Sequence, residues 1–359
     1  MPEIDSPSLS PFHLPQAHSV FGFPRLVADI GGTNARFGWL AAPGQAPSRI
    51  RSLTAEAYDG PVEAGRAYLA DVAAGWDGAV PDGRAPRHAA LAVATAVTGD
   101  KVVFTNSHWG FSRRALQTAL GLDSLLILND FESLAMSLPG LRAQQWRAHG
   151  QSPPLAGAAL AVVGPGTGLG VGAVVPTPSG QWVAVPGEGG HATLAATDAL
   201  ESDLLAWLRQ RHAHVSAERL LSGSGLPLLH QALAAVRGES VEALSAADIV
   251  ERGVAETAPL CSRTLDCFSA LLGSFAGNVA LTLGARGGLY IGGGIVPRFA
   301  DRFFASQFRQ RFEAKGRFAP YLAAIPTALI TDTLAALGGA ALALDQQLSA
   351  AAPPPASAP

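Results

Sequence analysis

An amide and a carboxylate follow an apolar run in the segment ILNDFESLA, which covers Ile127–Ala135. The run predicts a strand and the residues after it predict a helix, so Asn129 and Asp130 lie at the junction. Asn129 with Glu132 three residues later is the capping-box pattern, which gives both of them a structural role. Capping does not explain Asp130, and strand ends are where α/β proteins place reactive groups. Asp130 is therefore a candidate general base.

Two further segments carry isolated polar residues. Glu188 and His191 lie in the glycine-rich segment PGEGGHATL, and Glu218 lies in VSAERLLSG. Each has an ordinary explanation: a loop glutamate is solvated, a lone histidine is structural, and Glu218 stabilises the first turn of a short helix predicted at Ala217–Leu221. The His-x-His stretch at Arg211–His214 is polar and is predicted to lie at the surface.

These side chains share one property, since all are neutral or acidic hydrogen-bonding groups. Sugar hydroxyls both donate and accept hydrogen bonds, so carboxylates and amides suit a polyol ligand. A metal site is disfavoured because no cysteine or second histidine stands at ligand spacing around His191. The groups that would suit a polyol ligand such as a sugar are Asn129, Asp130, Glu188, His191 and Glu218.

Two glycine-rich turns each separate a pair of apolar runs. The first lies in LVADIGGTNARFGWL and the second in LAVVGPGTGLGVGAVV, so one hairpin pattern occurs twice, about 130 residues apart. Neither turn matches the Walker or the Rossmann pattern, because no Gly-Lys-Ser/Thr and no long helix follows it. The backbone N–H groups of such turns, with Thr33 and Thr167, can hold a phosphate; the alternative is a plain tight hairpin. The repetition favours a duplicated fold whose halves face each other across a cleft.

A carboxylate and a third glycine cluster extend this set. Asp29 ends a buried strand, where a charge is costly unless it is paired, and Mg²⁺ is a natural partner for it. The segment LYIGGGIVP at Leu289–Pro297 ends another apolar strand, after a helix with small residues at Ser274–Gly284. Its alternative explanation is a strand-end turn beside a tightly packed helix.

Short apolar runs alternate with longer helical patterns along the chain, which is typical of an α/β fold. We predict strands at Leu26–Ala28, Phe37–Leu40, Ala89–Ala94, Leu125–Leu128, Leu160–Val163, Gly170–Val175 and Leu289–Ile291. We predict helices at Ser112–Leu120, Phe131–Ser137, Ala199–Arg209, Ala217–Leu221, Leu265–Leu283 and Leu334–Leu348.

Length and composition limit the class of protein. The 359 residues exceed what one hydrophobic core usually spans, which favours two domains. A net charge of −3 without a dense Lys/Arg cluster argues against a nucleic-acid partner. Two cysteines, Cys261 and Cys267, fit a reducing compartment. The uncharged segment Leu155–Val175 has the length of a membrane span, but its central Gly-Pro-Gly-Thr-Gly would break a helix. We expect a cytoplasmic protein without a membrane segment.

Changes in composition predict the domain organisation. Residues 1–24 and 350–359 are rich in proline, serine and alanine, and we predict that they are disordered. Prolines and glycines around Leu138–Leu155 indicate a domain boundary. We expect a small α/β domain at 25–140 plus 331–349 and a large α/β domain at 141–330.

Five of these stretches, taken as a set, resemble the motifs of the actin-like ATPase superfamily in order and spacing. They are DIGGTNAR, ILNDFESLA, GPGTGLGVG, SFAGNVALTLG and IGGGIVP, which are similar to its phosphate-1, connect-1, phosphate-2, connect-2 and adenosine motifs. Within that superfamily, PGEGGH, VSAERLLSGSGL and KGRF resemble the bacterial glucokinase family. The similarity covers Leu26–Leu348, and it implies a two-domain, ribonuclease H-like α/β fold with a central cleft and hinged lobes.

The resemblance implies ATP-dependent phosphorylation of D-glucose at its 6-hydroxyl, with Mg²⁺ and with Asp130 as the base. By motif, glucose would be contacted by Asn129, Asp130, Glu188, His191 and Glu218. Phosphates would be held by Asp29, Gly31, Gly32, Thr33 and Asn34 and by Gly166, Thr167 and Gly168, with Asp29 also placing Mg²⁺. The adenosine would lie near Gly292, Gly293 and Gly294. Members of the family are cytoplasmic and commonly homodimeric.

Three features depart from the family pattern. They are Ala96 in place of proline, the segment Thr331–Gly339 without the usual Pro-Gly, and the extension before Leu26. Two alternatives stay open: a kinase for another hexose or another phosphoryl donor, and a non-catalytic sugar sensor on the same fold. A sensor of this kind would usually need an added DNA-binding domain, and the region before Leu26 is too short and proline-rich to be one.

Overall fold

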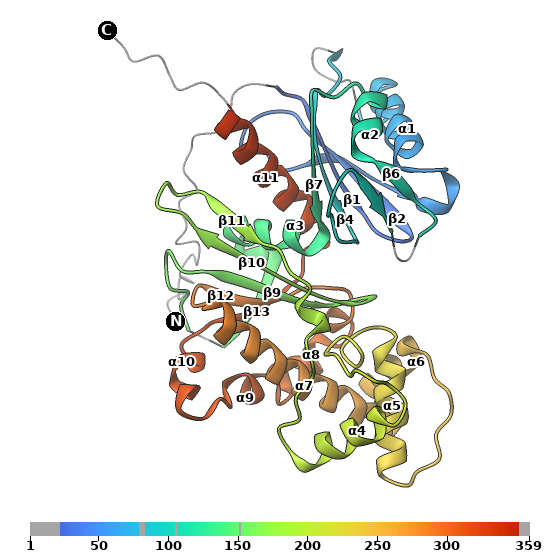
Figure 1. The fold of residues 1–359 in the computed structure, drawn as a ribbon, viewed down its shortest axis with the longest axis vertical. Coiled ribbons are helices and arrows are strands. Elements are labelled where there is room, and N and C mark those ends of the chain that lie inside the picture. The colour runs from blue at the N-terminus through green and yellow to red at the C-terminus, as the bar shows by residue number, and fades with distance from the viewer. Residues whose placement is uncertain (1–21, 79–82, 105–106, 151, 352–359) are drawn as a thin grey trace, which may run out of the picture. The chain divides into compact units, whose positions relative to one another are not determined.

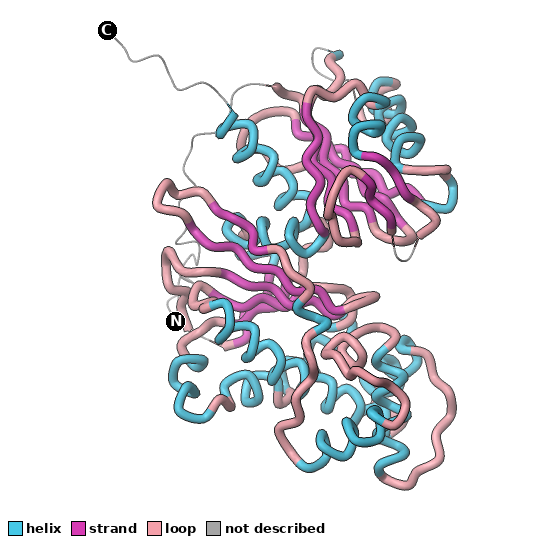
Figure 2. Tube along the Cα trace, viewed as in Figure 1, coloured by secondary structure: helices cyan, strands magenta, loops and turns pink. Residues whose placement is uncertain are grey.

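The computed structural model describes residues 22–78, 83–104, 107–150 and 152–351, which form two compact units (Figures 1 and 2). Unit 1 contains Arg142–Val175 and Val185–Asp332. Unit 2 contains the described residues up to Leu141, together with Pro176–Ala184 and the chain from Thr333. The predicted terminal extensions lie outside the described residues, except for 22–24 and for 350–351, which belong to the last helix.

Unit 2 is built on a five-stranded sheet with the order β3-β2-β1-β4-β7. Its strands are β1 (Arg25–Ile30), β2 (Asn34–Leu40), β3 (Ser48–Thr54), β4 (His88–Val93) and β7 (Ser124–Asn129). β1 and β2 form the predicted antiparallel hairpin, whereas β1, β4 and β7 run parallel. The unit also contains a small sheet of β5 (Lys101–Val103) and β6 (Gly110–Ser112), and the helices α1 (Pro61–Ala73), α2 (Arg113–Ala119), α3 (Asp130–Ser137) and α11 (Ala335–Ala351).

Both faces of the unit 2 sheet are covered, which explains why nearly every residue of β1 is buried. Alternate residues of β1, beginning with Leu26, share a core cluster with side chains of α1 and α2. Val27 faces the other side and packs with apolar residues of α11. Because side chains alternate along a strand, Asp29 lies on the same face as Val27.

The second sheet has six strands in the order β11-β10-β9-β12-β13-β8, and most of it lies in unit 1. Its strands are β8 (Trp146–His149), β9 (Leu160–Pro165), β10 (Leu169–Pro176), β11 (Trp182–Val185), β12 (Gly288–Ile291) and β13 (Thr327–Ile330). β9 and β10 pair antiparallel, so the uncharged segment Leu155–Val175 contains the predicted hairpin. β12 runs parallel to both β9 and β13.

The helices of unit 1 include α7 (Pro259–Leu283), which spans 25 residues. By length and composition α7 is apolar enough to cross a membrane, yet 78% of its apolar window is buried inside the protein. Its buried side chains share one core cluster with β9 and β12, whereas Arg263 and Asp266 are exposed, so α7 is a core helix with a short polar stretch at the surface. The other helices are α4 (Ala199–Arg209), α5 (Gly225–Val236), α6 (Ala246–Val254), α8 (Ala300–Ala305), α9 (Phe308–Glu313) and α10 (Ala319–Ala323).

One predicted helix is wrong. The other predicted strands and helices are present, with ends that shift by a few residues, but Ala217–Leu221 forms a turn. The N–H of Ala217 donates to the carbonyl oxygen of Ala192, and the N–H of Glu218 donates to that of Gly190. These bonds hold the segment against another loop, and the chain does not continue into the regular bonding ladder of a helix.

In unit 2, α11 approaches α3 so closely that only glycine fits at the contact. An ideal Cβ on Gly339 would lie 1.7 Å from the carbonyl oxygen of Ser133, whereas one on Gly338 would meet open space. The Ser133 hydroxyl donates to the carbonyl oxygen of Ala336 at 2.8 Å, which joins the two helices. Gly339 therefore serves the helix contact, while Gly338 only weakens α11.

We expect Gly339→Ala to lower the free energy of unfolding by about 1–3 kcal/mol, because α3 and α11 must separate to admit the methyl group. Gly338→Ala is the matched control, and it should raise the same quantity by up to about 1 kcal/mol because alanine favours a helix. Denaturant unfolding of both variants measures the difference. Equal effects of the two substitutions would contradict the close contact.

Candidate functional site

The parallel strands β1, β4 and β7 bring polar residues to one edge of the unit 2 sheet. Asp29 is in register with Ala92 of β4, and Asn129 is in register with Val93. Asp29 and Asn129 therefore lie on the two strands that flank β4, about 10 Å apart across the sheet. Because α/β proteins bind ligands at the carboxyl ends of parallel strands, this edge is a candidate site.

Asn129 ends β7 and caps α3, as predicted. Its Oδ1 atom accepts hydrogen bonds from the N–H of Phe131 at 2.9 Å and of Glu132 at 3.3 Å, and Glu132 Oε2 accepts from the N–H of Asn129. Its Nδ2 atom donates to the carbonyl oxygen of Thr95 at 3.3 Å. The Asn129 side chain also bonds the Asp130 carboxylate, which lowers the pKa of that group against the larger effect of burial.

Asp130 lies in the first turn of α3. The N–H of Phe131 also donates to Asp130 Oδ1 at 2.9 Å, which holds the carboxylate in place. Burial, and after it the charge of Asp29, raises the pKa of Asp130 to about 6, against the opposing effect of its hydrogen bonds. A carboxylate with this pKa is mostly ionised near pH 7 and is a better proton acceptor than an ordinary aspartate.

Asp29 has a raised pKa too, because burial outweighs the charge of Arg36. Arg36 Nη1 lies 3.8 Å from Asp29 Oδ2 and donates to the carbonyl oxygen of Thr333 at 3.1 Å. Within the described ranges, no three His, Cys, Asp or Glu side chains gather as a metal site. One loosely paired carboxylate fits Mg²⁺ that arrives with nucleotide phosphates, since Mg²⁺ then needs only one or two protein carboxylates.

The first glycine turn joins β1 to β2. The N–H of Gly31 donates to the carbonyl oxygen of Asn34 at 2.9 Å, which closes the turn. Thr33 and Asn34 are exposed, and Asn34 Nδ2 donates to Thr33 Oγ1 at 3.2 Å. The turn thus offers small residues, a hydroxyl and an amide to a ligand such as phosphate.

The second glycine turn, between β9 and β10, lies against the third glycine cluster. The N–H of Gly166 donates to the carbonyl oxygen of Gly168 at 2.8 Å. Gly293 has a φ of +77°, and an ideal Cβ on it would lie 2.3 Å from the carbonyl oxygen of Pro165. Only glycine allows this approach, so unit 1 brings together the turns predicted for phosphate and for adenosine.

The two loops of unit 1 with predicted sugar contacts pair with each other. The N–H of Glu218 donates to the carbonyl oxygen of Gly190 at 2.9 Å. His191 Nε2 consequently lies 3.9 Å from Glu218 Oε1. Glu188 directly precedes the 3-10 turn Gly189–His191 and is exposed. Unit 1 therefore gathers three of the predicted sugar contacts beside its two glycine turns.

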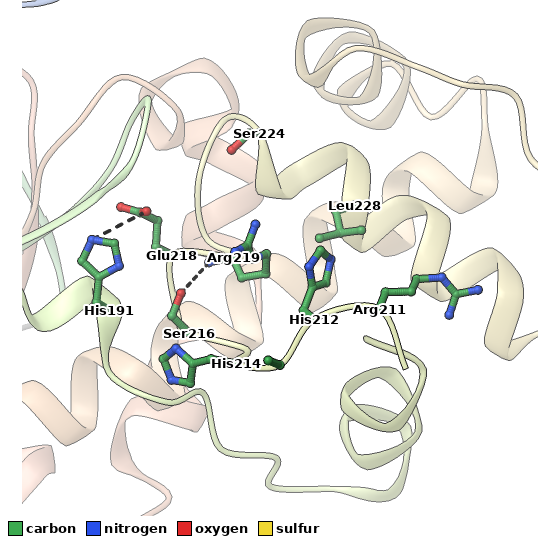
Figure 3. A pocket seen from close by; sticks show the side chains of 10 residues that line it. His191, Arg211, His212, His214, Ser216, Glu218, Arg219, Ser224 and Leu228 are labelled. Carbon is green, nitrogen blue, oxygen red and sulfur yellow. Dashed lines mark hydrogen bonds and ion pairs between the residues drawn. The ribbon is translucent and has the colours of Figure 1, made fainter. Parts of the chain in front are cut away.

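A pocket of about 510 Å³ opens beside His191 and Glu218, and Figure 3 shows these two side chains pointing toward one another. Its lining consists of His191, Arg211, His212, Ala213, His214, Ser216, Glu218, Arg219, Ser224 and Leu228. The stretch Arg211–His214, predicted as surface, is mostly exposed and also lines this pocket. The one sequence signal that this stretch lines the pocket is its position directly before the VSAERLLSG motif.

Two contacts of the site were missed from the sequence. Arg36 lies directly opposite Asp29 in the β1–β2 hairpin, so the register of the predicted hairpin contained the signal. The N–H of Leu169 donates to Glu218 Oε2 at 2.9 Å, and a separation of 49 positions along the chain leaves no local signal for this bond.

Comparison with known proteins agrees with these features. The sequence profile described as Glucokinase matches residues 26–347. The glucokinase of Aromatoleum aromaticum is 48% identical over 327 residues, which cover 91% of this chain and 96% of that protein. The crystal structure of a glucokinase from an Antarctic psychrotroph has a TM-score of 0.81 at 36% identity, and the match covers 90% of this chain and 99% of that one.

A ROK-family glucokinase from Streptomyces griseus, solved in complex with glucose and AMPPNP, has a TM-score of 0.60 at 19% identity over 90% of this chain and 99% of that one. This likeness concerns the fold alone. The predicted α/β fold of actin-like ATPases is confirmed. Because the family profile and the identity to the curated relative both extend over about nine tenths of the chain, it belongs to the glucokinase family of ATP-dependent hexose phosphotransferases.

Proposed function

We propose that this chain phosphorylates D-glucose at the 6-hydroxyl with ATP as the donor. Membership of the glucokinase family supports the substrates. The observation that supports the mechanism is Asp130, a carboxylate at a strand end whose pKa is raised to about 6. A coupled assay of ADP release with glucose, mannose, fructose and N-acetylglucosamine tests the proposal. We expect the highest kcat/KM with glucose; a higher value with another hexose would contradict the substrate, and no turnover would contradict the activity.

Asp130 is the proposed base. The oxygen of the 6-hydroxyl attacks the γ-phosphorus, the bond from that phosphorus to the bridging oxygen of ADP breaks, and Asp130 takes the hydroxyl proton. The hydrogen bond from Phe131 to Asp130 Oδ1 supports this role because it orients the carboxylate before the sugar binds. A positioned base typically contributes about 10²–10⁴-fold, and positioning with charge neutralisation contributes the rest.

The other hydroxyls of glucose are assigned to Asn129, Glu188, His191 and Glu218. Asn129 lies beside Asp130 at the end of β7, and the His191–Glu218 pair offers a donor and an acceptor close together. A site built to bond a hydroxyl can reject an analogue that lacks it by about 10⁴-fold or more, since its own polar groups are then left unpaired.

The phosphates and the cation are assigned to the glycine turns. We assign the phosphates to Asp29, Gly31, Gly32, Thr33, Asn34, Gly166, Thr167 and Gly168, and the adenosine to Gly292, Gly293 and Gly294. Asp29 is the proposed protein carboxylate for Mg²⁺, which when bound neutralises charge on the phosphates. The close approach of Gly293 to Pro165, which directly precedes the 166–168 turn, supports a shared nucleotide site within unit 1.

The family resemblance also supports a cytoplasmic homodimer. Sedimentation of the purified protein would test the oligomeric state. We keep the predicted domains, 25–140 plus 331–349 and 141–330, as part of this proposal.

We expect Asp130→Asn to lower kcat by at least about 10²-fold, while the Kd for glucose stays within about tenfold, because an amide still bonds a hydroxyl but cannot take its proton. The variant should also be more stable. The pKa of Asp130 is higher in the folded chain than its ordinary value of 3.8, so ionisation destabilises the wild type as pH rises from about 4 to about 6. At pH 8 the free energy of unfolding should rise by up to about 3 kcal/mol, and at pH 5 by less.

Asp123→Asn is the matched control for that substitution, because Asp123 is an exposed carboxylate of unit 2 that pairs with Arg87. It should leave kcat unchanged. Near-normal turnover of Asp130→Asn would remove Asp130 as the base.

Because Asp130 must be ionised to accept a proton, we expect kcat/KM for glucose to fall about tenfold per pH unit below about pH 6. Rates measured from pH 5 to pH 8 at saturating MgATP give this profile.

Asp29→Asn removes the charge that helps to raise the pKa of Asp130, so the fall should begin at a lower pH in that variant. Its maximal rate should also be lower and recover in part with added Mg²⁺, with glucose binding retained. If kcat/KM begins to fall at the same pH in both proteins, the fall is caused by the titration of a group other than Asp130.

A further inference from the structure

The Glu218 carboxylate has two contacts that belong to different parts of the site. Oε1 lies 3.9 Å from His191 Nε2, on the side of the proposed sugar contacts. Oε2 accepts a hydrogen bond from the N–H of Leu169 at 2.9 Å, and Leu169 directly follows the second glycine turn. One carboxylate therefore connects a proposed sugar contact to a proposed phosphate turn.

Gly168 provides the space for this hydrogen bond. An ideal Cβ on Gly168 would lie 2.5 Å from Glu218 Oε2 and 3.3 Å from its Cδ, whereas one on Gly166 would meet nothing within 4 Å. Neither glycine has a positive φ. Glycine at 168 therefore leaves room for the Glu218 carboxylate in this position, and the backbone conformation at 168 does not itself need glycine.

Backbone contacts hold the same segments together. The N–H of Gly223 donates to the carbonyl oxygen of Gly166 at 2.8 Å. On the other side, an ideal Cβ on Gly190 would lie 1.9 Å from the carbonyl oxygen of Leu169. The turn therefore packs against both loops that carry the proposed sugar contacts, and all of these residues belong to unit 1.

We propose that the Glu218–Leu169 hydrogen bond couples sugar binding to nucleotide binding, and that Gly168 is the positioning residue that permits it. This inference rests on the proposed function. A sugar hydroxyl bonded to Glu218 restricts the carboxylate, which strengthens its bond to Leu169 and orders the turn before ATP arrives. The nucleotide then has less ordering entropy to overcome, and each ligand tightens the binding of the other by the same factor.

The variant Gly168→Ala tests the coupling, with Gly166→Ala as its matched control. The alanine methyl at 168 meets the flexible end of Glu218, which can turn away, so we expect the fold to be retained and the bond to Leu169 to be lost. Calorimetric titration without nucleotide should show a Kd for glucose about tenfold or more above that of the wild type, since bonds to charged groups are the strong ones. Gly166→Ala should leave this Kd within about twofold, although both residues lie in the same turn.

Titrations with a non-hydrolysable ATP analogue present separate coupling from a structural defect. In the wild type the analogue should tighten glucose binding by about fivefold or more, and in Gly168→Ala this factor should fall to near one. A merely structural role of Gly168 would weaken both ligands and leave the factor intact. That result would overturn the inference.

Hydrogen exchange in the wild type provides a measurement that needs no variant. Glucose alone should slow exchange of the Leu169 amide, because its partner carboxylate becomes ordered. Unchanged exchange in the presence of saturating glucose, or equal glucose Kd values for the two alanine variants, would overturn the coupling. A wild type that does not bind glucose at all would instead overturn the proposed function.

Discussion

The burial of two carboxylates, Asp29 and Asp130, at one edge of the sheet is the constraint on which the candidate site of unit 2 depends. Both have raised pKa values, chiefly because burial disfavours the charged form, and the charge of Asp29 adds to the effect on Asp130. A chain free to rearrange would separate such groups or expose them. The parallel pairing of β1, β4 and β7 does not allow this, because helices cover both faces of these strands. Core packing thereby maintains two buried carboxylates at the sheet edge, at a cost in stability.

In unit 1 the main constraint is the close approach of several backbone segments to one another. Glycines at 190, 293 and 168 occupy positions where a Cβ would lie closer than 3 Å to another atom. They allow the β9–β10 turn, the 292–294 cluster and both loops with proposed sugar contacts to pack together. In the proposed function, backbone N–H groups bind phosphate and side-chain carboxylates bind sugar hydroxyls.

Local patterns predicted much of the fold. The capping box at Asn129 is present, and both hairpins form where alternating apolar runs enclose glycine turns. Several elements were missed, and for two of them the reason is clear. α5 begins Gly-Leu-Pro, which looks like a loop, although proline is tolerated in the first turn of a helix. β8 is a short edge strand of mixed polarity, so it lacks the alternation that indicates a strand. The helix predicted at Ala217–Leu221 does not form, because contacts with a distant loop override the weak local preference for a helix.

Seven strands, the Asn129 cap, the glycine turns and the family were predictable from the sequence, because each depends on residues close together in the chain or on a set of motifs in fixed order. It also named the carboxylates and the histidine of the candidate site. Which of these groups share an environment became visible in the folded chain alone. The pKa of Asp130 depends on burial by several elements and on a charge from another strand, and the Glu218–Leu169 bond joins residues 49 positions apart. Burial and long-range contacts belong to the folded chain as a whole, so no local pattern contains them.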